Sequence, residues 1–203
     1  MTVSKRLLDV LLALILGIIL LVPIGVVGIL CLILQGRPVL FLSERMHSPD
    51  RAFRLVKFRT MRSSATDSGA SGGNKSDRIT HLGHILRRTR LDELPQLWNI
   101  LRGDMSFVGP RPPLRDFVER YPEIYNQVLM NRPGVTGLAS LYYHAHEEKL
   151  LRHSQSAAET DVIYTRRCVP RKARLDLIYQ KHQSICFDIV LIAKTAMQPF
   201  RRR

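Results

Sequence analysis

The residues best suited to chemistry lie in the stretch 87–113, where two carboxylates stand among many cations. Asp92 and Glu93 are adjacent, arginines precede them, and Arg111 follows in a Gly-Pro-Arg-Pro turn. An isolated Asp-Glu pair at a helix start is commonly a surface ion pair. A diphosphate, however, needs cations to neutralise its oxygens, and a carboxylate can bind a bridging metal or attack phosphorus. This combination of two adjacent carboxylates with several arginines therefore favours phosphoryl chemistry.

Other catalytic patterns are missing from the sequence. It contains no GxxxxGK[ST], GxGxxG or HExxH pattern. Two histidine pairs, His81/His84 and His144/His146, have no third Cys or His at zinc-motif spacing, so we do not expect a structural metal site. The cysteines are Cys31, Cys168 and Cys186. They form no CxxC pair, which predicts reduced thiols.

Length and charge limit the possible classes of protein. The chain has 203 residues, enough for one globular domain and a membrane segment. Its net charge is +14, from 31 Lys and Arg against 17 Asp and Glu. Such an excess indicates a polyanionic partner, which could be nucleic acid, an anionic membrane surface or a phosphorylated substrate. Charge alone does not choose among them.

The N-terminal segment is long and apolar. Asp9 is the only charged residue in Leu7–Leu34, a run of 28 residues. A straight helix of that length would reach about 42 Å, and about 20 residues suffice to cross a bilayer. Pro23 divides the run, so a kinked spanning helix and a re-entrant hairpin are both open on the residues alone. Basic residues flank both ends, which suits a hairpin better.

The remaining chain predicts a mostly helical α+β fold with a short β-hairpin. Strands are expected at 39–42 and 53–58. The Ser-, Gly- and Asn-rich segment 63–77 is either a functional loop or a plain connector. Helices are expected at 79–90, 91–101 and 114–129, the last split by Pro122, and near the C-terminus.

Two of these helices bear on function. Leucines recur at helical spacing through 91–101, and Pro95 suits the first turn, so Asp92 and Glu93 are expected at or just before the helix N-terminus. In the C-terminal helix, Ile185 and Ile189 begin an apolar face. That face could pack into the core or lie on an anionic membrane.

Four segments of the sequence resemble the monotopic phosphoglycosyl transferases, the bacterial sugar transferases that begin glycan assembly. They are KFRTM at 57–61, LDELPQLWNIL and GDMSFVGPRP within 91–112, RPGVTG at 132–137, and the stretch 175–196. The resemblance covers nearly the whole chain, in order. The chain is similar to small members that consist of the catalytic unit alone.

The resemblance implies a mechanism and a cofactor. Asp92 would be the nucleophile, attacking the sugar-bearing phosphate of a UDP-sugar and releasing UMP, with Mg²⁺ bound at Asp92 and Glu93. A polyprenol phosphate would then take the phosphosugar from Asp92. Glu93 would bind metal or manage protons. The expected substrate- and phosphate-binding residues are Lys57, Arg59, Arg111, Arg132 and Asp176.

The resemblance also implies a topology and the partners. Residues 1–36 would form a re-entrant membrane hairpin, and 37–203 a catalytic domain on the cytoplasmic face of the bacterial inner membrane. The anionic membrane, not nucleic acid, would then explain the basic excess. Two departures from the family pattern are Val22 before Pro23, where serine is common, and Leu138–Ser140 in place of Trp-Ala-Gln. A metal-dependent lipid phosphatase and a non-catalytic basic membrane scaffold are the alternatives.

Overall fold

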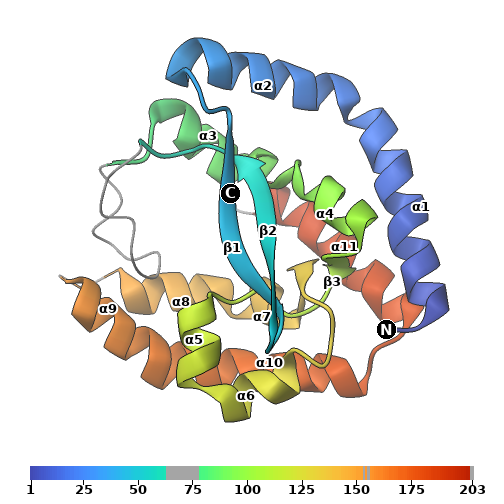
Figure 1. Ribbon diagram of the computed structural model, residues 1–203, viewed down its shortest axis with the longest axis vertical. Coiled ribbons are helices and arrows are strands. Elements are labelled where there is room, and N and C mark those ends of the chain that lie inside the picture. The colour runs from blue at the N-terminus through green and yellow to red at the C-terminus, as the bar shows by residue number, and fades with distance from the viewer. Residues whose placement is uncertain (63–77, 153, 155, 202–203) are drawn as a thin grey trace.

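Helices make up most of the computed structural model, which describes residues 1–62, 78–152, 154 and 156–201 (Figure 1). The predicted mostly helical α+β class with a short hairpin is confirmed, whereas the segment 63–77 lies outside the described residues. In chain order the elements are α1 Val3–Ile19, α2 Leu21–Gln35, β1 Leu40–Ser48, β2 Arg51–Phe58, α3 His81–Thr89, a 3-10 turn Leu91–Glu93, α4 Gln96–Arg102, β3 Ser106–Val108, α5 Arg115–Arg120, α6 Pro122–Val128, β4 Gly134–Thr136, α7 Leu138–Tyr142, α8 His144–Leu151, α9 Ala157–Ile163, a π-helical turn Tyr164–Cys168, α10 Val169–Lys181 and α11 Ile185–Arg201.

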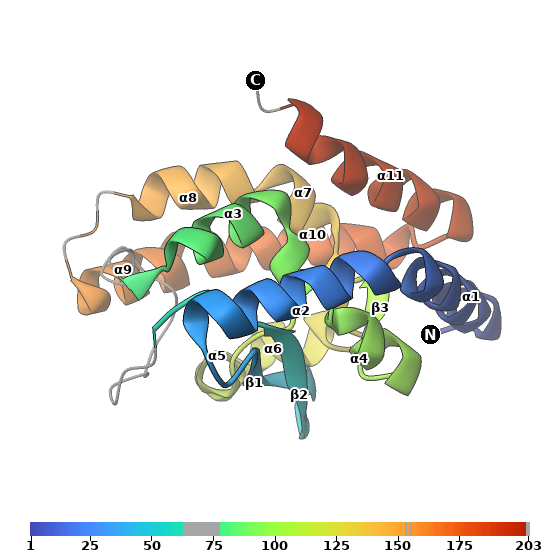
Figure 2. The same ribbon diagram turned by 90° about the horizontal axis from the view of Figure 1, so that it is seen from above.

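The apolar N-terminal run forms two helices, α1 and α2, which meet at a bend of 63° (Figure 2). Within the described residues no single helix has the length and hydropathy of a membrane span, although this bent pair does when taken together. The break falls at Leu20, three residues before Pro23. Proline clashes with the carbonyl four residues earlier, which belongs to Ile19, the last residue of α1. Pro23 itself lies in the first turn of α2, where its missing N–H costs no hydrogen bond.

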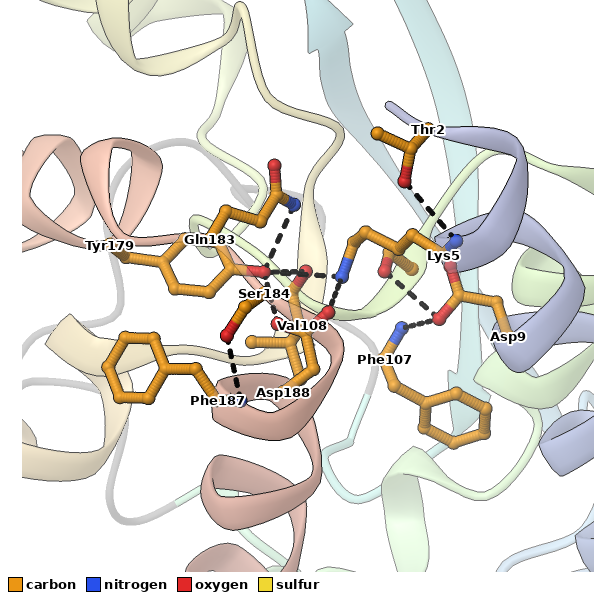
Figure 3. A network of polar contacts seen from close by, with 11 residues as sticks. Thr2, Lys5, Asp9, Phe107, Val108, Tyr179, Gln183, Ser184, Phe187 and Asp188 are labelled. Carbon is orange, nitrogen blue, oxygen red and sulfur yellow. Dashed lines mark hydrogen bonds and ion pairs between the residues drawn. The ribbon is translucent and has the colours of Figure 1, made fainter.

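The N-terminal end of α1 is fastened to the body by a buried polar network (Figure 3). Lys5 Nζ lies 2.6 Å from Asp188 Oδ2 in α11 and donates to the Tyr179 hydroxyl at 3.2 Å. The Tyr179 hydroxyl in turn donates to Asp188 at 2.6 Å. One turn along α1, Asp9 accepts a hydrogen bond from the Phe107 amide at 3.1 Å. Three parts of the sequence that lie far apart, α1, β3 and the consecutive helices α10 and α11, therefore meet at this junction.

The C-terminal end of α2 is held by Arg59, which follows β2. Its guanidinium donates to the carbonyl oxygens of Gln35 and Gly36, the latter at 2.9 Å. The Gln35 side chain also accepts a hydrogen bond from the Thr80 hydroxyl at 3.3 Å. Because α1 is fastened at its start and α2 at its end, both ends of the bent pair rest on the same body.

The β1–β2 hairpin is longer than predicted, and one of its faces carries two cations. Arg45 pairs with Phe53 and Phe41 with Lys57 across the ribbon. Paired residues, and residues two apart, share a face, so Arg45 and Lys57 point to the same side as the buried Phe53. Asn99 fastens α4 to β2, since its amide accepts from Val56 N and donates to the Arg54 carbonyl.

The parallel pairing of β3 with β4 was not predicted from the sequence. Ser106 pairs with Gly134 and Val108 with Thr136. A Cβ at Gly134 would lie 2.1 Å from the amide nitrogen of Gly109, so only glycine permits this approach. The GDMSFVGPRP and RPGVTG motifs are thus joined through their backbones.

The predicted helices are present, with Pro122 beginning α6 as expected. The apolar face expected for α11 is divided between the core and the surface, and a carboxylate also faces inward. Ile185 and Ile189 are 40% and 52% exposed, whereas Asp188 and Leu191 are each 1% exposed. Pairing of Asp188 with Lys5 turns the helix so that a carboxylate faces inward.

The buried pair predicts an asymmetric mutational response. Lys5→Met leaves the Asp188 carboxylate buried without its cation and should cost about 3–5 kcal/mol of unfolding free energy. Lys5→Met combined with Asp188→Leu should recover part of that loss, measured by thermal unfolding in detergent micelles. Arg115→Met, which breaks an exposed pair with Glu44, is the control and should change little. A double variant as unstable as Lys5→Met would contradict this account.

Candidate active site around Asp92 and Glu93

A left-handed residue positions the two carboxylates. Arg90 adopts φ 61° and ψ 14° at the end of α3, an uncommon conformation for a residue with a side chain. It reverses the chain so that Leu91–Glu93 forms a separate 3-10 turn before α4. Asp92 and Glu93 therefore lie just before the N-terminus of α4, as predicted, and their positions are fixed by backbone geometry.

Asp92 is a buried carboxylate with a free oxygen. Asp92 is 7% exposed. Its Oδ1 is buried and has no hydrogen-bond partner among the described residues. Burial and the neighbouring Glu93 carboxylate raise the pKa of Asp92, against the opposing effect of Lys57, Arg87 and Arg90. A carboxylate with an unpaired oxygen surrounded by cations is suited to attack an electrophile that those cations bind.

Glu93 has the opposite electrostatic character. Its Oε1 lies 3.3 Å from Arg111 Nη2 and 3.5 Å from Arg90 Nη1. Burial would raise the pKa of Glu93, but Arg111 and Arg90 outweigh burial and hold it below its usual range. Glu93 in turn raises the pKa of Arg111. Neighbouring carboxylates in one turn are thus pushed in opposite directions, which is typical of groups with different roles.

Lys57 reaches the site from β2. Its ammonium lies 5.4 Å from the centre of the Phe41 ring on the opposite strand. Burial, together with Arg45, Arg111 and Arg87, lowers the pKa of Lys57 to about 8, and Asp92 opposes this shift. Cations gathered this closely repel one another, and a bound polyanion would relieve that repulsion.

A second polar group lines the site on the α10 side. Lys172 Nζ lies 3.1 Å from Glu147 Oε2 and donates to the Tyr164 hydroxyl at 3.1 Å. Tyr164 begins the π-helical turn, a feature frequent at functional sites. One turn beyond Lys172, burial raises the pKa of Asp176 to about 7, with Lys172 opposing.

An amphipathic cavity of about 210 Å³ opens beside the carboxylates. Its apolar wall comes from α1, α4, β3 and β4. Its polar end comes from Arg88, Arg90, Glu93 and Arg111. The cavity thus connects the apolar N-terminal pair with the charged site.

The structure brings together only some of the residues predicted for the site. Lys57 and Arg111 lie around Asp92 and Glu93, and Asp176 lies behind Lys172. Arg59 instead clamps the end of α2. Arg132 lies against Gly103, at the far end of α4, within electrostatic range of Arg6 and Asp9.

Several residues around the site were not selected from the sequence. They are Arg45, Glu147, Tyr164 and Lys172. Arg45 and Lys57 share a face of the ribbon, so the correct strand register would have revealed Arg45. No comparable sequence signal exists for the others, which come from α8, the π-helical turn and α10.

The site fits a metal ion that is held largely by its substrate. Among the described residues no group of three or more His, Cys, Asp or Glu could hold a metal. The unpaired Oδ1 of Asp92 and the carboxylate of Glu93 are available. Mg²⁺ is commonly bound by one or two carboxylates together with phosphate oxygens and water, so the donor set present suits it.

Comparison with known proteins identifies the family. Residues 1–202 match the family described as bacterial sugar transferase. The chain belongs to this family, which confirms the resemblance drawn from the KFRTM, 91–112 and RPGVTG segments.

Curated relatives are named for phosphosugar transfer. A UDP-N-acetylgalactosamine-undecaprenyl-phosphate N-acetylgalactosaminephosphotransferase of Aeromonas hydrophila is 33% identical over 164 residues, 78% of this chain and 34% of the relative. An undecaprenyl-phosphate galactose phosphotransferase of Salmonella typhimurium is 34% identical over 184 residues, 83% of this chain and 34% of the relative. A UDP-glucose:undecaprenyl-phosphate glucose-1-phosphate transferase of Escherichia coli is 31% identical over 167 residues, which cover 80% of this chain and 33% of the relative. The chain spans about a third of the length of these relatives.

The opposite pKa shifts predict opposite effects of neutral substitutions on stability. The raised pKa of Asp92 means that the unfolded chain loses its proton first, so the native protein loses stability as pH rises above about 4. Asp92→Asn should therefore raise the melting temperature at pH 7, and this gain should disappear in acid. The lowered pKa of Glu93 gives stability above about pH 4, lost as pH falls through the folded-state value.

Glu93→Gln should accordingly lower stability at pH 7 by about 1–3 kcal/mol, because Arg111 and Arg90 lose a charged acceptor. Thermal unfolding from pH 3 to pH 8 measures both variants. A lower melting temperature for Asp92→Asn at pH 7 would contradict the electrostatic account.

Proposed function

We propose that the protein is a phosphoglycosyl transferase that moves a phosphosugar from a UDP-sugar to polyprenol phosphate, initiating glycan assembly. The observation that carries this proposal is the buried Asp92 carboxylate, with a free Oδ1, among Lys57, Arg87 and Arg90. The family match and the names of the relatives support the substrate classes.

The proposed reaction has two half-reactions. An oxygen of the ionised Asp92 attacks the sugar-bearing phosphorus of the donor, and the bond from that phosphorus to the bridging oxygen breaks. UMP leaves with the electron pair of that bond, and the phosphosugar remains on Asp92 as an acyl phosphate. A phosphate oxygen of polyprenol phosphate then attacks the same phosphorus. This frees the carboxylate and forms polyprenol diphosphate sugar.

The charged residues of the chain have distinct parts in this scheme. Lys57 and Arg111 neutralise phosphate oxygens, which both positions the donor and stabilises charge in the transition state. Glu93 holds Arg111 and Arg90 in place through its paired carboxylate. Mg²⁺, bound at Asp92 and Glu93 with the phosphates, would supply further neutralisation of phosphate charge.

The amphipathic cavity supports a lipid phosphate as acceptor. Its apolar wall includes Leu16 of α1 and Leu20 at the bend, and its cationic end includes Arg90 and Arg111. A molecule with an isoprenoid chain and a phosphate headgroup matches both ends. Burial of the apolar part contributes binding free energy, and the arginines direct the phosphate towards Asp92.

Residues 1–36 are proposed to form a re-entrant membrane hairpin that carries the catalytic domain 37–203 on the cytoplasmic face of the inner membrane. Large apolar side chains cover the outer surfaces of α1 and α2. Among them, Ile18 is 77% exposed and Val22 is 71% exposed. Such a surface requires an apolar environment. Lys5 and Gln35, at opposite ends of the pair, both contact the catalytic domain, which favours re-entry over crossing.

Release of UMP tests the proposed function. The purified protein with Mg²⁺, undecaprenyl phosphate and a panel of UDP-sugars should release UMP with at least one donor. Asp92→Asn should lower turnover by about 10³-fold or more, because the nucleophile is lost. Asp116→Asn, which removes an exposed carboxylate paired with Arg120, is the control and should retain activity.

Two outcomes would count against the proposal. Release of free phosphate instead of UMP would identify a phosphatase. Full activity of Asp92→Asn would exclude Asp92 as the nucleophile.

Cysteine labelling tests the re-entrant topology. In a Cys186→Ser background, Val3→Cys and Arg37→Cys should both react with a membrane-impermeant maleimide from the cytoplasmic side. The remaining cysteines, Cys31 and Cys168, are buried. Ile18→Cys, next to the bend, should stay unlabelled from either side of intact membranes. Labelling of positions 3 and 37 from opposite sides would establish a spanning pair.

A further inference from the structure

Arg45 is a half-buried cation that has no carboxylate partner among the residues described by the structure. It projects from β1, its Nε is buried without a hydrogen-bond partner, and it forms no ion pair with any of the described residues. Its electrostatic neighbours include Arg111, and burial followed by Arg111 lowers the pKa of Arg45 to about 10. A buried guanidinium nitrogen without a partner, on a half-buried arginine beside other cations, destabilises the fold, so a ligand is the natural explanation for it.

The backbone around Arg45 is firmly held. The next residue, Met46, is 1% exposed, and its amide donates to the Pro113 carbonyl at 3.0 Å. The cross-strand partner Phe53 packs into the core. Arg45 therefore projects from a rigid ribbon on the same face as Lys57, and the two side chains converge on the site together with Arg111.

The cations of the site fall into two sets. Arg88, Arg90 and Arg111 line the amphipathic cavity, the proposed entry of the lipid phosphate. Arg45 and Lys57 are not among its lining residues, and they approach from the hairpin. Arg111 lies between the sets, since it contacts Glu93 and is also an electrostatic neighbour of Arg45.

We propose that Arg45 binds the phosphate that stays with the nucleoside when the donor is cleaved, so that Arg45, Lys57 and Arg111 hold the leaving UMP. This inference rests on the proposed function. In-line displacement at the sugar-bearing phosphorus requires the leaving oxygen to lie opposite Asp92. The hairpin cations are then placed to neutralise the charge that develops on the leaving phosphate. Arg45 thus acts in the first half-reaction alone.

Kinetics separate this role from a structural one. In a two-step transfer through Asp92, kcat/KM for each substrate reports only its own half-reaction. Arg45→Met should lower kcat/KM for the UDP-sugar about 10- to 100-fold, the loss expected for a charged hydrogen bond, and leave kcat/KM for undecaprenyl phosphate unchanged. Arg45→Lys, which keeps the charge, should restore part of the donor activity.

The matched control is Arg54→Met in the same hairpin. Arg54 is exposed and pairs across the ribbon with Glu44, and the same substitution there should leave both kcat/KM values unchanged. Thermal unfolding supplies a second readout. Because Arg45 has no carboxylate partner within the described parts of the chain and faces like charges, Arg45→Met should melt no lower than the wild type.

Direct binding provides a readout that does not depend on turnover. In the Asp92→Asn background, Arg45→Met should weaken UMP binding about 10- to 100-fold and leave uridine binding unchanged, because only the phosphate contact is lost. Unchanged UMP affinity would overturn the inference. So would a fall in kcat/KM confined to undecaprenyl phosphate, or equal losses in Arg45→Met and Arg54→Met. Absence of UMP release by the wild type would instead overturn the proposed function and this inference with it.

Discussion

The arrangement of the molecule depends on the buried ion pair between Lys5 and Asp188. Removing two charges from water is costly, and the pair is stable here because the Tyr179 hydroxyl donates a further hydrogen bond to Asp188 and accepts one from Lys5. The pair fixes where α1 lies against α11. It thereby determines where the apolar surface of α1 meets the polar site, and so where the cavity wall carrying Leu16 stands.

Asp92 and Glu93 illustrate how a single turn produces two different carboxylates. Both are removed from water, yet only Glu93 receives two arginine partners. The two arginine contacts hold Glu93 in place through Oε1, whereas Asp92 has an unpaired Oδ1 that can attack an electrophile. Burying Asp92 in this way lowers the stability of the folded protein. Such a loss is typical of functional sites, where a residue is positioned for its reaction and not for stability.

Structural features that depend on neighbouring residues in the chain were predicted correctly from the sequence. The spacing of leucines and the position of Pro95 were enough to place Asp92 and Glu93 before α4, and Pro122 divided α5 from α6 as expected. The bend at the N-terminus was also expected, although it lies at Leu20 because the clash with proline acts on the preceding turn.

Residues whose roles depend on distant contacts could not be placed in this way. Arg59 and Lys57 are two apart in sequence, yet one clamps α2 and the other faces the site, because the strand ends between them. The inward position of Asp188 on α11 was not predicted from the sequence, since its partner Lys5 lies 183 residues away. The role of Arg45 required the strand register, and the pairing of β3 with β4 joins motifs that no local rule connects.

The same separation of 183 residues between Lys5 and Asp188 imposes an order on biosynthesis. At about 5–20 residues per second, a ribosome completes Asp188 roughly 10–40 s after Lys5. During that interval Lys5 lacks its buried partner, so the position of α1 against the body is not yet fixed, whereas the residues that hold the end of α2, Arg59 and Thr80, are made much earlier. α11, which follows the other described elements in the sequence, then fastens α1.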